Sequence, residues 1–189
     1  EDCQIAELPN GLFAGCTSLT SIEIPASVTT IANGNYSQVY NLGVFFNCTS
    51  LSDVTFAEGS AIEYIGNYAF YGCEALETIE FPETEIEFGT YVFAYCSSLD
   101  NVVIPESANV DGSSYLFYYC TSLTNVTLPE MTEIPSGFFS RCSLITEFDI
   151  PDTVGYVGWN AFAYTGITKA VILAGVEYEG AAYAGSAIT

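Results

Sequence analysis

The chain has 189 residues and is 50% hydrophobic, which excludes an intrinsically disordered protein and allows a sizeable core. Two basic residues stand against 23 acidic ones, a formal net charge of −21, so nucleic acid and anionic membrane surfaces are excluded as partners. No apolar stretch approaches the ~18 residues of a transmembrane helix, and the lack of histidine removes the commonest general base and metal ligand.

One motif recurs along the chain: a phenylalanine, a cysteine three residues later, and then an apolar strand-like segment that usually ends in proline. Apart from a longer first interval, the copies begin twenty-odd residues apart, a period typical of solenoids in which each repeat adds one strand to a continuous sheet. The seventh copy carries Thr165 in place of cysteine. The six cysteines of the motif are Cys16, Cys48, Cys73, Cys96, Cys120 and Cys142.

The chain starts inside a repeat, so residues 1–12 read as a partial unit. In the first complete unit Ile22 and Ile24 alternate with exposed positions, as in a strand whose i and i+2 side chains share a face. Pro25 ends this strand, because proline cannot donate to a ladder. A second extended segment with inward residues such as Val28 follows. Each unit therefore predicts one longer and one shorter extended segment.

The first interval is the longest because residues 32–43 insert a polar loop rich in Asn and Gly between two rungs. This loop carries Tyr36 and Tyr40, which need not serve the repeat and are suited to anchoring a partner. We expect the loop to bulge from one face as a candidate binding element.

Every later unit repeats the strand, the turn, the short segment and an aromatic anchor. A single rung cannot bury its own apolar edge, so neighbouring rungs must stack and inward residues must form columns. The segment before each anchor has room for one turn of 3₁₀- or α-helix. Near the end, Tyr183 and Ser186 repeat the spacing with substitutes, so residues 175–189 are predicted to be a degraded copy. The anchors are Phe13, Phe45, Phe70, Phe93, Phe117, Phe139 and Phe162.

The unit F-x-x-C-x-x-L-x-x-(I/V)-x-(I/F)-P resembles the BspA-like leucine-rich repeats, also called the Treponema pallidum type, from about residue 8 to residue 186. The resemblance implies a leucine-rich-repeat solenoid, a β-rich right-handed superhelix. We expect one parallel sheet on one face, with short strands and 3₁₀ or one-turn helices on the other. The whole chain, 1–189, is then one domain of about seven repeats.

Proteins of that family occur on or outside cells, and those with known roles mediate adhesion. The resemblance thus implies a monomeric, extracellular or cell-surface module that binds a protein, such as a host matrix or cell-surface protein, or a glycan. No catalytic residue, cofactor or metal site comes with it, and the charge favours a basic partner surface. Two alternatives stay open: a spacer that presents another domain, and a glycoside hydrolase with two carboxylates such as Glu23 and Asp53.

Strand positions five and seven after the cysteine point away from the core and are rich in acidic and amide side chains. If this sheet lines a concave side, it carries a negative stripe that steers a basic partner; the alternative is ordinary solvation. The candidate partner-binding residues are Glu23, Asp53, Glu80, Asn101, Asn125, Glu147 and Asp149, with Tyr36 and Tyr40 in the loop.

The remaining motif residues have structural interpretations. The cysteines offer no C-x-x-C pair for a metal. Adjacent rungs, about 4.7–4.9 Å apart, would permit disulfides, but thiols in one column point the same way. We therefore predict buried, unpaired thiols, with Cys3 outside the column as the exposed one. Tyrosines beside the anchors, such as Tyr95 and Tyr118, are expected to form an outer aromatic layer with hydroxyls in water.

Overall fold

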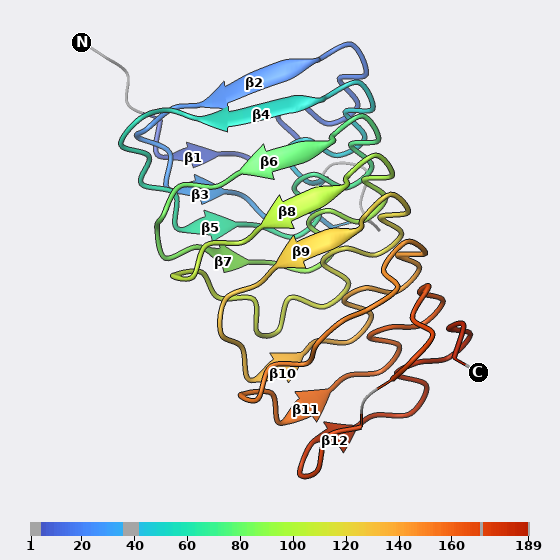
Figure 1. The fold of residues 1–189 in the computed structure, drawn as a ribbon. Coiled ribbons are helices and arrows are strands. Elements are labelled where there is room, and N and C mark those ends of the chain that lie inside the picture. Colours follow the sequence, from blue (N-terminus) through green and yellow to red (C-terminus); the bar gives the residue numbers. More distant parts are fainter. Residues whose placement is uncertain (1–4, 36–41, 171, 189) are drawn as a thin grey trace.

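The computed structural model describes residues 5–35, 42–170 and 172–188. The chain winds into a stack of rungs with two layers of parallel strands (Figure 1). In this view the front strands run to the left and those behind run to the right as the chain descends, so the coil is right-handed. The predicted β-rich solenoid is confirmed.

The front layer, which we call the long-strand face, contains the strands that follow the Phe-x-x-Cys motifs. Apolar residues lie opposite apolar residues along it: Ile22 faces Val54, and Ile79 faces Val102. Parallel pairing joins β2 to β4 and links β6, β8 and β9. The strands are β2 (Ser21–Ile24), β4 (Asp53–Phe56), β6 (Thr78–Glu80), β8 (Asn101–Val103) and β9 (Asn125–Thr127).

The layer behind, the short-strand face, contains the second extended segment of each rung. Its strands are two residues long and pair in parallel in two groups, β1-β3-β5-β7 and β10-β11-β12. In all but β12 the second residue is buried, and Ile31 thus aligns with Ile65 and Phe88. They are β1 (Glu7–Leu8), β3 (Thr30–Ile31), β5 (Tyr64–Ile65), β7 (Glu87–Phe88), β10 (Glu133–Ile134), β11 (Tyr156–Val157) and β12 (Glu177–Tyr178).

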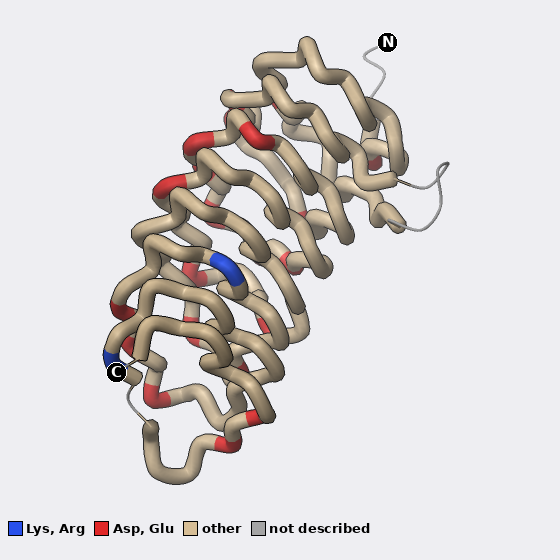
Figure 2. Tube along the Cα trace, turned by 90° about the vertical axis from the view of Figure 1, so that its right-hand side faces the viewer, with Lys and Arg blue, Asp and Glu red and all other residues tan. Residues whose placement is uncertain are grey.

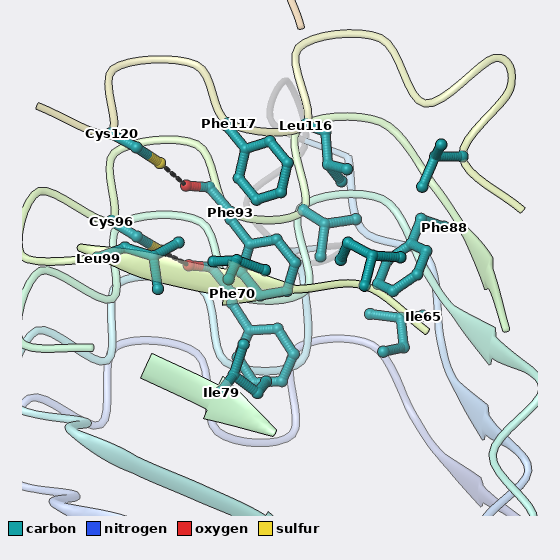
Figure 3. Packing of buried hydrophobic residues seen from close by; sticks show 14 of the residues in the cluster. Ile65, Phe70, Ile79, Phe88, Phe93, Cys96, Leu99, Leu116, Phe117 and Cys120 are labelled. Carbon is teal, nitrogen blue, oxygen red and sulfur yellow. Dashed lines mark hydrogen bonds between the residues drawn. The ribbon is translucent and has the colours of Figure 1, made fainter. Parts of the chain in front are cut away.

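The aromatic anchors form one continuous stack through the core. Successive ring centroids from Phe13 to Phe162, and on to Tyr183, lie 5.0 to 5.9 Å apart. Figure 3 shows Phe70, Phe93 and Phe117 in this stack, with aliphatic side chains beside them. The predicted column of anchors is confirmed, and it fixes the position of every rung relative to the next.

The helical turns that we expected before the anchors are absent from the described residues, which contain tight turns there instead. The residues two before and two after an anchor adopt positive φ, with the exception of Gly43 before Phe45; around Phe93 the values are 55° for Tyr91 and 63° for Tyr95. These left-handed residues interrupt any right-handed helix. The Phe93 N–H donates to the Leu116 carbonyl of the next rung at 3.0 Å, whereas a helix would keep it within the rung.

The six motif cysteines are free thiols, and the five buried ones also join neighbouring rungs. The Cys96 thiol donates to the Phe70 carbonyl at 3.2 Å, and the Cys120 thiol donates to the Phe93 carbonyl at 3.1 Å (Figure 3). Five of the six motif cysteines are buried, as predicted; Cys16 in the first complete rung is exposed. The remaining cysteine, Cys3, lies outside the described residues.

Candidate interaction surfaces

The long-strand face exposes all seven strand residues that the sequence singled out. Its strand pairing separates the acidic ones from one another: Glu23 lies opposite Thr55, and Asp53 lies opposite Ser21. Further along, Glu80 lies opposite Val103, an exposed aliphatic residue. The negative stripe is therefore interrupted by uncharged side chains.

Two small hollows bring some of these predicted residues together. Glu80 and Asn101 line a hollow of about 240 Å³, and Asn125, Glu147 and Asp149 line another of about 270 Å³. Glu147 and Asp149 belong to an extended segment without an assigned strand.

The loop candidates Tyr36 and Tyr40 lie outside the described residues, so the binding role of the loop stays a prediction.

For the hydrolase alternative, the register puts Glu23 and Asp53 diagonally across two strands on an exposed face. A carboxylate acts as an acid at neutral pH when an apolar pocket raises its pKa. Neither Glu23 nor Asp53 lines the two hollows on this face or the larger hollow on the opposite face.

That larger hollow, of about 810 Å³, lies on the short-strand face. We call it the short-strand groove; its lining includes Glu63, Tyr64, Glu83, Glu85, Glu87 and Asn109. It crosses rungs, because Glu87 pairs with Tyr64 on one side and forms a bridge with Asn109 on the other. Four carboxylates thus converge on one depression.

Hydroxyl groups fix the floor of the short-strand groove. The Thr84 hydroxyl donates to the Ile62 carbonyl at 2.8 Å, and the Ser107 hydroxyl donates to the Thr84 carbonyl at 2.7 Å. Each bond joins one rung to the next, so residues that line the groove also link neighbouring rungs.

The glutamates of this groove are absent from the predicted site residues, although the sequence contains a signal for them. Glu83, Glu85 and Glu87 alternate with other residues, and alternate residues of an extended segment share a face. The predicted residues all come from the segment after each cysteine or from loop 32–43, whereas these glutamates belong to the second extended segment of the rung. Glu63 joins them from the preceding rung.

A third surface, the tyrosine face, lies over the Phe-x-x-Cys turns, which point toward the viewer in Figure 2. The rungs nearest the viewer are mainly tan, so this side carries few charges. Tyr68, Tyr91 and Tyr115 form a stacked column with centroids 5.1 and 4.6 Å apart. Burial, more than the neighbouring tyrosines, raises the pKa of Tyr91 to about 12, so its hydroxyl stays protonated at neutral pH.

A second column on this face contains residues two after the anchors, among them Tyr95, Tyr119, Arg141 and Tyr164. The Arg141 guanidinium carbon lies 5.6 Å from the Tyr119 ring centroid and 4.5 Å from that of Tyr164, so the cation sits between two tyrosine rings. The expected aromatic layer is thus present, and it holds one of the two basic residues of the chain.

Over residues 5–35, 42–170 and 172–188, no group of three or more histidine, cysteine, aspartate or glutamate side chains could hold a metal ion. The same residues include no helix long and apolar enough to cross a membrane.

Stacked parallel rungs, a central phenylalanine stack and cysteine ladders between rungs define a leucine-rich-repeat solenoid. The sequence model of the BspA type leucine rich repeat region matches six copies in this chain, over residues 6–114 and 63–186. The protein belongs to this family. A comparison with curated protein sequences gave no match.

Solved structures show the same fold. A T. pallidum leucine rich repeat protein is 28% identical with a TM-score of 0.69, over 85% of this chain and 70% of its own. A leucine rich cell surface protein from Faecalibacterium prausnitzii is 28% identical with a TM-score of 0.58, over 98% of this chain and 42% of its own. A Bacteroides ovatus leucine-rich repeat protein, at 24% identity and a TM-score of 0.66, covers 91% of this chain and 48% of its own. The chain thus spans less than half of the last two proteins.

Leucine-rich-repeat proteins typically bind other proteins and are generally not enzymes. Family membership therefore makes this chain a protein-interaction module.

Proposed function

We propose that the chain is a secreted or cell-surface module that binds a basic partner protein through the short-strand groove. The observation that carries the proposal is the convergence of Glu63, Glu83, Glu85 and Glu87 on one hollow of about 810 Å³. The F. prausnitzii relative described as a cell surface protein supports the location.

Charge supports both the encounter and the contact. A net charge of −21 attracts a basic protein over long distances and raises its association rate. At close range the four glutamates supply acceptors, and Tyr64 beside them supplies an aromatic anchor of the kind enriched at interfaces. Since the groove crosses more than one rung, an extended basic segment would fit across it.

The long-strand face, with Glu23, Asp53, Glu80 and the other predicted residues, is a second candidate for the same role, as is loop 32–43 with Tyr36 and Tyr40. A glycan partner and a spacer role remain the alternatives to protein binding. Each hollow on the long-strand face gathers two carboxylates, whereas the short-strand groove gathers four, so we rank that face below the groove.

An array of extracellular matrix proteins, cell-surface proteins and glycans tests the proposal. Two variants, each with three charges removed, separate local contact from overall charge. Glu83 is unchanged in both, because it lines the groove and also the long-strand hollow that contains Glu80. The groove variant carries Glu63→Gln, Glu85→Gln and Glu87→Gln, and the long-strand variant carries Glu23→Gln, Glu80→Gln and Glu147→Gln.

We expect at least one basic protein to bind, and the groove variant to lose about tenfold in affinity while the long-strand variant loses less than about threefold. Equal losses would mean that only net charge matters, and a larger loss in the long-strand variant would move the site to that face. If the wild-type protein binds nothing on the array at low salt, the spacer role takes the place of this proposal.

A further inference from the structure

We propose that the tyrosine face is a site of oxidative cross-linking, where a small one-electron oxidant joins the stacked rings of Tyr91 and Tyr115 as a dityrosine. The new bond links two adjacent rungs covalently. Neither residue lines the short-strand groove, so the cross-link does not depend on the proposed function.

The two residues belong to a cluster of tyrosines on three successive rungs. Each ring contacts other rings of the cluster, at centroid distances of 4.6 to 6.3 Å. An electron removed from one ring can be replaced from a neighbour at this distance, so an oxidation anywhere in the cluster reaches the stacked pair. The members of the cluster are Tyr68, Tyr71, Tyr91, Tyr95, Tyr115, Tyr118 and Tyr119.

Within the cluster, Tyr91 and Tyr115 have the closest and most nearly parallel rings, with centroids 4.6 Å apart and an angle of 3° between the planes. Both residues precede an anchor by two positions and adopt similar positive φ values, 55° and 59°, so their side chains leave the backbone in the same direction. Dityrosine forms through a bond between ring carbons that lie next to the hydroxyl-bearing carbons. Parallel rings at equivalent positions of adjacent rungs present these carbons to each other.

The neighbouring rungs hold this pair of rings in place. The Tyr91 N–H donates to the Ser114 carbonyl at 3.0 Å, which ties the rung of Tyr91 to the residue just before Tyr115. Gly137 occupies the equivalent position of the following rung, and the Tyr115 ring lies where a side chain at Gly137 would be. The ring is thus confined between a glycine and Tyr91. Reacting groups held in this way couple faster than groups that must meet by diffusion.

The pair is also accessible, and the chain offers few other side chains that lose an electron readily. Tyr91 and Tyr115 are half-buried, and Tyr119 at the edge of the cluster is 37% exposed. The sequence contains 14 tyrosines but only one tryptophan, one methionine and no histidine. The methionine, Met131, and five of the six motif cysteines are buried. Tyrosine is therefore the main electron donor that a small oxidant meets.

The coupling consists of two one-electron oxidations and one bond. Each tyrosine gives one electron to an oxidant molecule and the proton of its hydroxyl to water, which leaves a phenoxyl radical. Burial raises the pKa of Tyr91 to about 12, so at neutral pH its proton must leave with the electron. The two radicals form a carbon–carbon bond, and the hydrogen on each bonded carbon moves through water to the oxygen of the same ring. The product has two hydrogen atoms fewer than the two tyrosines.

The test uses the intact chain at low concentration, with light, tris(bipyridine)ruthenium and persulfate as the one-electron oxidant. Dityrosine fluorescence and the loss of two hydrogen atoms from the intact mass detect the bond, and peptide mapping assigns the two tyrosines. Tyr91→Phe removes the central hydroxyl of the Tyr68–Tyr91–Tyr115 stack and keeps its ring. Tyr164→Phe is the matched control, because Tyr164 is 50% exposed on the same face but outside the cluster. Thermal melting checks the fold of both variants.

We expect one main cross-link within the native wild-type molecule, between Tyr91 and Tyr115. Tyr91→Phe should lower the yield of intramolecular dityrosine about tenfold, because it removes the closest pair, and Tyr164→Phe should leave the yield unchanged. In urea, the unfolded wild-type protein should lose the preference for this pair. The cross-linked protein should also unfold at a higher urea concentration than the untreated protein, since the bond restricts the unfolded chain.

Cross-links formed mainly between molecules, through Tyr119 or Tyr164, would overturn the proposal. So would an unchanged yield in Tyr91→Phe, the same tyrosine pairs in native and urea-unfolded protein, or no dityrosine at all.

Discussion

The motif cysteine is a hydrogen-bond donor in a narrow column. Each buried thiol donates to the carbonyl of the anchor in the preceding rung, at distances of 3.0 to 3.3 Å. This explains its substitutes near the C-terminal end: the Ser186 hydroxyl donates to the Phe162 carbonyl of the preceding rung at 2.7 Å, and the Thr165 hydroxyl donates to the same carbonyl within its own rung at 2.9 Å. The position thus requires a small side chain with one donor.

The sequence predicted the burial of these residues but not the hydrogen bond. Period and composition indicate which residues share a column, because apolar side chains recur at fixed offsets from Phe93 or Phe117. The direction of a thiol depends on the turn conformation, which the residue type does not define. The exposure of Cys16 likewise follows from its place in the first complete rung, and not from its local sequence.

Thiol accessibility tests this account at the residue scale. In a Cys3→Ser background at pH 8, we expect iodoacetamide to label Cys16 in the native protein and the other five motif cysteines only after denaturation. Burial raises the pKa of Cys48 to about 11, although a hydrogen bond with the Cys16 backbone lowers it by a smaller amount, and burial also raises the pKa of Cys96. The thiolate is the reactive form, so any native labelling of Cys48 should increase as pH approaches 11.

Mass spectrometry of the intact protein counts the labels, and peptide mapping assigns them. Rapid native labelling of Cys96 at pH 8 would contradict its burial in the column.

At the scale of the element, the two extended segments of each rung were predictable and the turn was not. Alternation around Ile22 and the following Pro25 indicated the longer strand. The prediction of a helical turn was wrong, because Tyr91 and Tyr95 adopt positive φ. A tyrosine does not indicate positive φ in the sequence, whereas a glycine such as Gly72 does. Where left-handed residues flank an anchor, its N–H pairs with the next rung.

Anchor truncation tests the stacked rungs. Phe93 is fully buried between Phe70 and Phe117, at centroid distances of 5.6 and 5.9 Å. We expect Phe93→Ala to lower the free energy of unfolding by about 3–5 kcal/mol, as a large-to-small change in a core. Phe162→Ala, nearer the C-terminal end, should reduce global stability less, because repeat stability is a sum of nearest-neighbour terms.

Urea unfolding of the two variants, followed by circular dichroism, measures the difference. The same loss of unfolding free energy at both positions would be inconsistent with a stack in which each rung contacts only its neighbours.

At the scale of the whole molecule, composition predicted the sign of the partner's charge but not the surface that concentrates it. The predicted residues on the long-strand face are exposed. The short-strand groove is larger than the hollows on that face and lies on the opposite side of the solenoid. There Glu63 lies beside Glu85 and Glu87 of the next rung. The groove depends on the alignment of rungs, which a pattern within one rung does not contain.

The salt dependence of partner binding tests the central claim, that a basic protein binds in the short-strand groove. With a basic protein selected on the array, log affinity is measured against log salt concentration for the wild-type protein, the groove variant and the long-strand variant. Salt screens charges over a Debye length of about 10 Å at 0.1 M, so wild-type affinity should decrease steeply as salt increases. We predict that the slope becomes clearly shallower in the groove variant and stays near wild type in the long-strand variant. A wild-type affinity that does not change with salt, or equal slopes in all three proteins, would contradict the claim.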